Sequence, residues 1–168
     1  YIFVLRSDGK VYFTDRGVNG WNQYGYGSPS ISQNTSYVDI AVGSGPIAGY
    51  VFVLRNDGCV YFTDRGVNGW HLYGYGSPSI EVSTAYVGIA RGSGTTAGYV
   101  YVLRNDGKVF FTDRGVNGWY QYGYGSPSIE RSNAYVSIVS SSGNSAGYVF
   151  VLRNDGKVFF TDRGVNGW

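Results

Sequence analysis

The polar and aromatic groups best suited to holding a ligand lie in one loop that the chain repeats. This loop, Asp15-Arg16-Gly17-Val18-Asn19-Gly20-Trp21, occurs in identical copies that end at Trp21, Trp70, Trp119 and Trp168. Sugar recognition uses such a mixture: an aromatic face packs against the apolar C–H patch of a pyranose ring, and planar amide, carboxylate or guanidinium groups bind its hydroxyls. The loop therefore predicts a carbohydrate-binding surface.

A second, glycine-rich segment follows this loop in three identical copies. It begins as Tyr24-Gly25-Tyr26-Gly27-Ser28-Pro29-Ser30-Ile31 and contributes two tyrosine rings per copy. Rigid aromatic side chains on loops limit the entropy lost on binding. The predicted carbohydrate-binding residues are these rings and the groups of the preceding loop: Trp21, Trp70, Trp119, Tyr24, Tyr26, Tyr73, Tyr75, Tyr122, Tyr124, Asp15, Arg16, Asn19, Asp64, Arg65, Asn68, Asp113, Arg114 and Asn117.

The same residues also have a purely structural interpretation. The Trp ring could join one repeat unit to the next, and Asp15 could pair with Arg16 within the loop. Glycines could serve only to supply positive φ. Of Tyr24 and Tyr26, one ring could face inward and the other solvent. The sequence leaves both interpretations open, because recent duplication alone would make the copies alike.

Catalytic and metal-binding patterns are missing from the sequence. The chain has one His (His71), one Cys and two Glu, and no nucleophile–base pair recurs with the repeat. It contains no zinc-ligand cluster and no Gly-x-x-x-x-Gly-Lys-Ser/Thr phosphate loop. Asp15 and Asn19 do not have EF-hand spacing. We therefore expect a protein that is not an enzyme and that uses no cofactor or metal.

Composition argues against several classes of partner. Lys and Arg total 13 and Asp and Glu total 11, so the net charge of +2 is too small to indicate a nucleic-acid surface. Apolar runs are too short to insert into a membrane. Cys59 is the single cysteine and can form no disulfide within the chain. Low charge, 17 Tyr, 27 Gly and one weak glycosylation sequon at Asn34 favour a secreted, extracellular protein.

The elements that carry these loops follow a 49-residue period. Units of 21 residues begin at residues 1, 50, 99 and 148 and differ at only five positions. Each unit predicts two short strands of aromatic and β-branched residues, joined at an Asp-Gly hairpin turn in which both residues tolerate positive φ. We predict a third strand at 37–42 and a weaker fourth around 22–26, with equivalents in the other periods. No helical periodicity is present.

The strand sequences predict an all-β propeller with blades of about four antiparallel strands. Val-Phe-Val-Leu is apolar on both faces, so each hairpin must be covered on both sides, as in a sheet stacked between two others. A fixed period of this length is typical of propeller blades. A β-trefoil and an elongated β-repeat array are the alternatives.

The repeat resembles the tectonin and tachylectin-like β-propeller lectins. The resemblance rests on the order Gly-Trp, then Tyr-Val-x-Ile-Ala-x-Gly, then Tyr-Val-Phe-Val-Leu-Arg-Asn-Asp-Gly-Lys-Val-Tyr-Phe. It covers most of each repeat as a pattern, and the 49-residue unit is longer than the usual tectonin unit. The resemblance implies a propeller that binds sugars.

The period does not divide the chain evenly. Residues 1–168 form one repeat domain in which the last period is partial, and the absence of methionine indicates a processed chain or part of a longer one. Propellers have about four to eight blades. We therefore expect a second chain, in a homo-oligomer, or further repeats to complete the ring.

These observations favour a multivalent lectin with one site per blade or blade junction, whose partners are glycans on glycoproteins or polysaccharides. Several weak sites would gain avidity on one surface. A structural or adhesive extracellular repeat protein is the first alternative, since near-identical Tyr- and Gly-rich repeats also suit assembly. A protein-interaction scaffold is the second, because many propellers serve that role.

Overall fold

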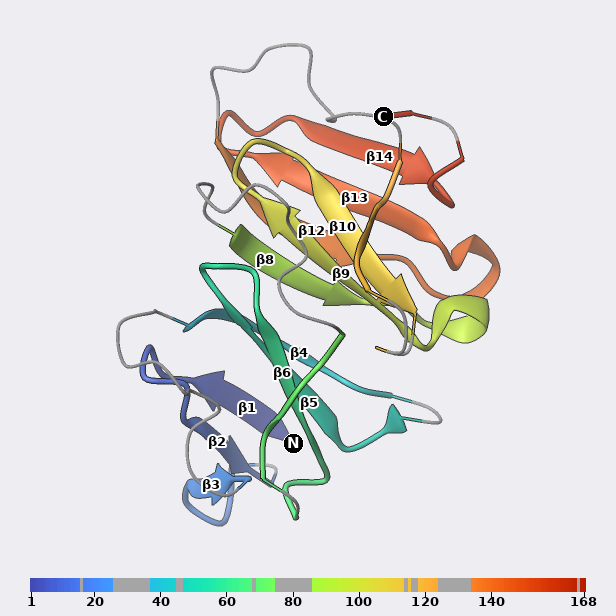
Figure 1. Cartoon of the computed structure of the whole chain (residues 1–168). Helices are drawn as coiled ribbons and strands as arrows, with labels where there is room; N and C mark the ends of the chain where they lie inside the picture. The colour runs from blue at the N-terminus through green and yellow to red at the C-terminus, as the bar shows by residue number, and fades with distance from the viewer. Residues whose placement is uncertain are drawn as a thin grey trace.

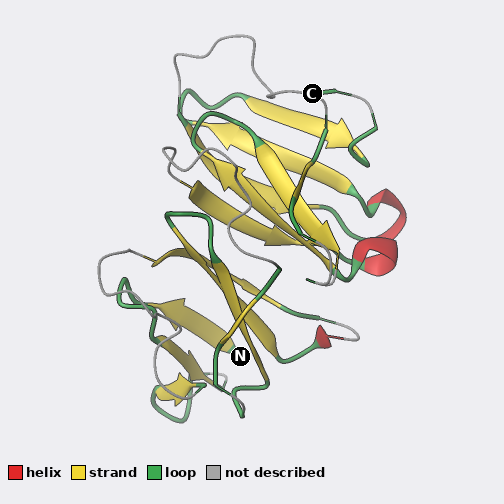
Figure 2. Ribbon diagram, in the orientation of Figure 1, coloured by secondary structure: helices red, strands yellow, loops and turns green. Residues whose placement is uncertain are grey.

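The chain folds almost entirely into antiparallel β-sheet. The computed structural model describes residues 1–15, 17–25, 37–44, 47–67, 69–74, 86–113, 115, 118–123, 134–165 and 167–168. Within these ranges, four sheets follow one another from the N-terminal end to the C-terminal end (Figure 1). Helix occurs only as short turns, among them Gly94–Thr96 and Gly143–Ser145 (Figure 2).

The two middle sheets have four strands and the two outer sheets three. The first sheet consists of β1 (Ile2–Leu5), β2 (Val11–Thr14) and β3 (Asn22–Tyr24). The second consists of β4 (Tyr37–Val42), β5 (Tyr50–Arg55), β6 (Val60–Asp64) and β7 (His71–Leu72). The third consists of β8 (Tyr86–Arg91), β9 (Tyr99–Arg104), β10 (Val109–Asp113) and β11 (Tyr120–Gln121). The fourth consists of β12 (Tyr135–Ser140), β13 (Tyr148–Arg153) and β14 (Val158–Asp162). The strand predicted at 37–42 is confirmed as β4, and the weaker one as the shorter β3.

A tight turn joins one pair of neighbouring strands in every sheet: β1 to β2, β5 to β6, β9 to β10 and β13 to β14. In the second sheet the amide of Gly58 donates to the carbonyl of Arg55 over 3.0 Å, and Gly58 has a φ of 91°. Asn56 and Asp57 therefore occupy the centre of the turn, and glycine follows them. The predicted hairpins are confirmed. Asp and Gly both tolerate positive φ, but the bend forms one residue earlier than Asp-Gly, and only the glycine is left-handed.

Both faces of the middle strands are buried, as their apolar sequences predicted. Phe52 and Leu54 of β5 share a core cluster with Val100 of the third sheet. Val51 and Val53, on the opposite face of β5, share another cluster with side chains of the first sheet. Each middle sheet is therefore packed between two neighbours, which is how propeller blades bury apolar surface.

The first strands of the second, third and fourth sheets lie next to one another, with β8 between β4 and β12. Asp39 of β4 joins two of them, because its Oδ2 accepts a hydrogen bond of 2.8 Å from the Ile89 amide of β8. Burial raises the pKa of the Asp39 carboxyl, while the amides of Ile89 and Ile40 oppose that rise. β4, β8 and β12 thus form one row of contacting strands, the inner strands of these three sheets.

In the part of the chain that the structure describes, no helix is long and apolar enough to cross a membrane. Cys59 is half-buried and forms no disulfide with the described residues. We predict from the sequence that a second chain or further repeats complete the partial last period and pack against the outer sheets, and this stays a prediction.

Candidate functional site

The repeated loop starts with a turn at an arginine. The amide of Val67 donates to the carbonyl of Asp64 over 3.2 Å, and between them Arg65 and Gly66 have φ values of 52° and 69°. Left-handed backbone is unfavourable for arginine by about 1 kcal/mol. Arg163 of the fourth sheet has the same φ of 52°, so the repeat itself imposes this conformation.

An ion pair accompanies this turn. Nε of Arg65 lies 3.7 Å from Oδ1 of Asp64, and the arginine side chain is largely exposed. The equivalent pair, Asp162 with Arg163, has the same separation of 3.7 Å. This is the pairing that the structural interpretation predicted for the loop, and exposed pairs of this kind stabilise a fold by less than about 1 kcal/mol.

The loop is held against the preceding sheet through one carbonyl group. The Gly49 carbonyl accepts hydrogen bonds from the Arg65 amide over 2.9 Å and from the Tyr24 hydroxyl over 2.6 Å. The same tyrosine contact recurs as Tyr73 to Gly98 and Tyr122 to Gly147. The first tyrosine of each predicted pair therefore joins successive sheets.

The invariant tryptophans also lie at these junctions. A Cβ added at Gly25 would lie 2.8 Å from Nε1 of Trp70, and one at Gly74 would lie 2.6 Å from Nε1 of Trp119. Only glycine leaves room for such an approach. The indole nitrogens of Trp70 and Trp119 are buried, with no hydrogen-bond acceptor among the described residues, so they offer no donor to a ligand in solvent.

Several predicted binding residues are thus part of the packing. Tyr73 and Tyr122 are buried, and a ligand could reach them only if the junction opened. Trp21 differs, because 53% of its surface is exposed. Asn19 beside it is exposed as well. Asp15 and Asp113 are half-buried and have interaction partners.

The remaining predicted residues lie outside the described part of the chain. They are the second tyrosine of each pair and several polar groups of the loops: Tyr26, Tyr75, Tyr124, Arg16, Asn68, Arg114 and Asn117. The sequon at Asn34 also lies outside it. Their predicted roles stay predictions.

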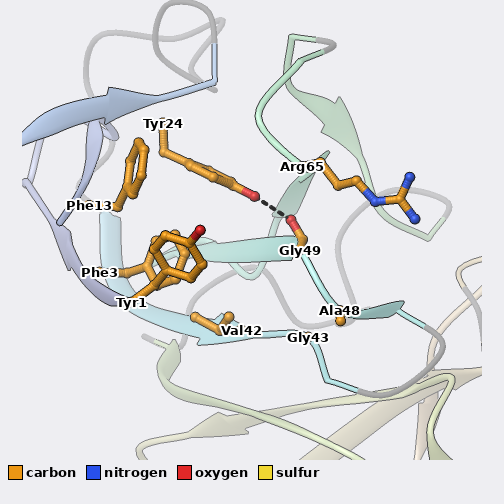
Figure 3. Close-up of a pocket in the computed structure, with 9 residues that line it drawn as sticks. All are labelled: Tyr1, Phe3, Phe13, Tyr24, Val42, Gly43, Ala48, Gly49 and Arg65. Carbon is orange, nitrogen blue, oxygen red and sulfur yellow. Dashed lines mark hydrogen bonds between the residues drawn. The ribbon is translucent and has the colours of Figure 1, made fainter. Parts of the chain in front are cut away.

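A pocket of about 600 Å³ lies between the first and second sheets. Figure 3 shows its aromatic wall, formed by the rings of Tyr1, Phe3, Phe13 and Tyr24, facing the end of β4 and the segment before β5. Its lining consists of Tyr1, Phe3, Phe13, Tyr24, Val42, Gly43, Ala48, Gly49 and Arg65. Two of the predicted binding residues, Tyr24 and Arg65, are thereby brought to one site.

The rings of this wall are fixed by one another. The Tyr24 ring meets Phe3 and Phe13 edge to face, with centroids 5.1 Å and 5.2 Å away. Burial raises the pKa of the Tyr24 hydroxyl, and the nearby Asp64 carboxylate adds to that rise. The hydroxyl is therefore a neutral donor committed to Gly49, and the wall presents mainly carbon to a ligand.

The opposite rim carries Arg65, the one cation among the described residues that line the pocket. The Cγ of Arg65 packs at the Gly49 backbone, where an added Cβ would lie 2.7 Å from it. Figure 3 shows the guanidinium pointing away from the rings. The arginine thus contributes its aliphatic stem to the pocket and its charge to the edge.

Sequence analysis missed most of this lining. The sequence identifies Tyr1, Phe3 and Phe13 only as residues of strands, although alternate positions of a strand share a face and can indicate an aromatic surface. Val42 was also missed, because that position varies among the repeats, as Val42, Arg91 and Ser140. Among the described residues, no group of His, Cys, Asp or Glu could hold a metal ion.

No protein-family model matches the chain, and no curated protein matches it. Solved structures do match its shape. The chain superposes on a COPII outer coat vertex on membranes with a TM-score of 0.70 at 14% identity, over 96% of its length. It superposes on YCF48 bound to D1 peptide with a TM-score of 0.60 at 15% identity, and on the β-propeller domain of Cps50 (Swd1) from Myceliophteria thermophila with 0.58 at 9%, each over 92% of the chain.

These similarities establish the fold and nothing finer. Identity is at most 15%, and the chain spans 44% of the length of each of these three proteins. Together with the stacked four-stranded sheets, they confirm the predicted β-propeller. The resemblance to tectonin-type lectins stays a prediction.

Proposed function

We propose that this propeller is a non-enzymatic scaffold that binds a protein partner at the aromatic pocket between its first two sheets. The observation that carries the proposal is the rigid wall of Tyr1, Phe3, Phe13 and Tyr24 around a volume of about 600 Å³. Such a volume accommodates a large apolar side chain of a peptide. YCF48, which has a similar fold, has been solved with a bound peptide, in keeping with the proposal.

The chemistry of the pocket favours a peptide over a sugar. A sugar requires planar polar groups that bind vicinal hydroxyls. Here the Gly49 carbonyl already accepts two hydrogen bonds, the Tyr24 hydroxyl donates one of them, and the guanidinium of Arg65 points outward. Burial of an apolar side chain needs none of these groups, because removing apolar area from water contributes about 25 cal/mol per Å².

The test is selection of peptides from a displayed library on the purified protein, followed by measurement of affinity for each hit by calorimetry. We expect hits to share an aromatic or large aliphatic residue, whose replacement by alanine abolishes binding. Hits without any such residue, or no hits on well-folded protein, would contradict the proposal.

The repeats supply a matched pair of variants at Val42 for the same experiment. Arg91 and Ser140 occupy its position in the next two sheets, so Val42→Arg and Val42→Ser place side chains that the fold already accepts. Val42→Arg brings a long cation to the pocket and should weaken the affinity for an apolar peptide at least about tenfold. Val42→Ser should change this affinity far less. Equal affinities in both variants would place the binding elsewhere.

A carbohydrate remains the second candidate because Trp21 is exposed beside Asn19. An exposed indole face and a nearby amide suit the apolar and polar sides of a pyranose ring. This candidate retains the lectin hypothesis and the tectonin resemblance. A glycan array with free-sugar competition tests it: binding that Trp21→Ala abolishes would favour the lectin, and a blank array on folded protein would remove it.

A further inference from the structure

A second cavity, of about 400 Å³, lies where the three inner strands end. β4, β8, β12 and the residues that follow them line it. Its polar groups come from one arginine and four serines, namely Arg91, Ser44, Ser93, Ser140 and Ser142, and the rest of its lining is aliphatic. Nothing in the proposed protein-binding function uses this arginine or these serines.

Arg91 is the feature that distinguishes this cavity. The equivalent positions in the neighbouring sheets hold Val42 and Ser140, so the repeat does not require an arginine for folding. Its side chain reaches across to the second sheet, where Nη2 donates to the hydroxyl of Ser44 and Nη1 lies 3.5 Å from the Ser44 carbonyl. Nη1 also lies 3.5 Å from the carbonyl of Ala97.

All of these acceptors are neutral. Within the described ranges of the chain, no carboxylate lies within ion-pairing distance of Arg91, although other arginines such as Arg55 and Arg104 each pair with an aspartate. Burial lowers the pKa of the Arg91 guanidinium, which means that its positive charge is partly desolvated. A partly desolvated cation without a counter-ion favours the binding of an anion.

The serines around it can adapt to such a ligand. The hydroxyl of Ser140 donates to the Arg91 carbonyl, and that of Ser93 donates to the Ser141 carbonyl over 3.0 Å. The Ser142 hydroxyl forms no cap to the short helical turn that it precedes. The Ser44 hydroxyl, which accepts from Arg91, and the Ser142 hydroxyl still have their hydrogens to donate, so these two groups can rotate to bind an oxyanion without moving the backbone.

We propose that this cavity is an anion site that binds a carboxylate group through Arg91. A single guanidinium neutralises a single charge, and its planar fork matches the two oxygens of a carboxylate. The inference goes beyond the proposed function and does not depend on the aromatic pocket. The carboxylate could belong to a small organic acid or to an acidic side chain of a peptide.

The test is a titration of the purified chain with sodium acetate and with a capped peptide that contains one glutamate, followed by NMR of Arg91 and Ser44 at constant ionic strength. Acetate should give saturable shifts at these residues. Arg91→Ser, which copies the residue at Ser140, should weaken binding at least about tenfold, since hydrogen bonds to charged groups contribute about 1.5–3 kcal/mol. Arg6→Ser removes the same charge elsewhere and should leave the affinity unchanged.

The outcomes separate the alternatives. Binding of both probes supports the site and allows a peptide source, and binding of acetate alone supports it with a small acid as the ligand. Equal shifts in Arg91→Ser, equal shifts with chloride alone, or tighter binding of phosphate than of acetate would overturn the proposal. Failure of peptide selection at the aromatic pocket would leave the acetate result intact, so the two proposals fail separately.

Discussion

The hairpins of the first and second sheets have nearly the same sequence but different surroundings. Val51 and Val53 of β5 are fully buried, at 0% exposure, whereas Ile2 and Val4, their equivalents in β1, are 57% and 41% exposed. The residues are equally apolar, and their strands pair in the same register with the next strand. Burial is therefore a property of the neighbouring sheet, not of the strand that supplies the side chain.

The hairpin arginines show the same contrast. The side chain of Arg104 in the third sheet is 2% exposed, pairs with Asp106 and lies 5.7 Å from the centre of the Phe110 ring. Arg6 in the first sheet forms the same pair with Asp8 at 3.1 Å, but its side chain is 58% exposed. One sequence motif thus provides an ion pair with a buried arginine at one place and an ion pair with an exposed arginine at another.

The largest difference is expected for a charge placed on the two equivalent valines. Val53→Asp buries an unpaired carboxylate and should lower the free energy of unfolding by about 4 kcal/mol or more. Val4→Asp leaves the carboxylate partly in water and should lower it by less than about 1 kcal/mol. Urea unfolding followed by tryptophan fluorescence measures the free energy of unfolding of both variants. Similar decreases in the two would show that Val4 of the first sheet is also buried in solution.

A smaller difference is expected between two glycines with the same backbone. Gly74 and Gly17 have φ values of 74° and 72°, so alanine strains the backbone at either position by about 1 kcal/mol. At Gly74 the new Cβ would also lie 2.6 Å from Nε1 of Trp119, whereas at Gly17 no atom lies within 4 Å. Gly74→Ala should therefore lower the free energy of unfolding by about 1–3 kcal/mol more than Gly17→Ala in the same assay.

If the two alanine variants have the same free energy of unfolding, the Trp119 ring can move aside at no cost in stability and does not stabilise the junction. In that case the tryptophans would again be available as ligand contacts, as the binding interpretation of the loop predicted. A red shift of tryptophan emission in Gly74→Ala alone would instead support a displaced ring at the junction.

The two arginines give the next prediction. Arg104→Ala removes a buried partner of Asp106 and a ring contact, and should lower stability by about 2 kcal/mol, because the remaining carboxylate is still partly hydrated. Arg6→Ala should change it by about 0.5 kcal/mol or less. Thermal unfolding of both variants checks this difference, and a larger effect at Arg6 would mean that the first sheet is buried by another chain.

The smallest effect concerns pH. Arg153 lowers the pKa of Asp155 to about 2, below the value of about 3.9 for an unfolded chain. Since the folded state favours the charged carboxylate, its contribution to stability is complete above about pH 4 and is lost as the pH falls from about 4 to 2. Asp155→Asn should flatten the fall in unfolding free energy over that range, and an unchanged slope would show that the pair contributes nothing.

Much of the fold could be predicted because its signals are local. The turn at Asn56, Asp57 and Gly58 depends on glycine taking positive φ, and the strand at 37–42 follows from its alternating and β-branched residues. The sequence Val-Phe-Val-Leu has no polar face, so it predicts that another sheet packs on each side of the strand. These inferences need no knowledge of which sheet lies next to which.

The candidate site could be predicted only in part. Tyr24 and Arg65 were identified, but one belongs to the first sheet and the other to the second, and the pocket exists only where the two meet. Val42 escaped notice because its position varies, although variation at a ligand-facing position distinguishes otherwise identical repeats. The roles of Trp70 and Trp119 depend on the glycines of a neighbouring sheet, a relation across 45 residues of sequence that no local pattern contains.

The amino acids alone determine the repeat period, the hairpins and the need of strands that are apolar on both faces for a sheet on each side. They do so because backbone conformation and hairpin pairing depend on residues close in the chain. Tertiary packing decides that Tyr73 lies in the core and Trp21 on the surface. It also places Arg91 in a cavity that has no carboxylate among the described residues. Solvent exposure depends on what lies opposite a side chain, and for repeats of one sequence the same residue can be core, surface or binding site.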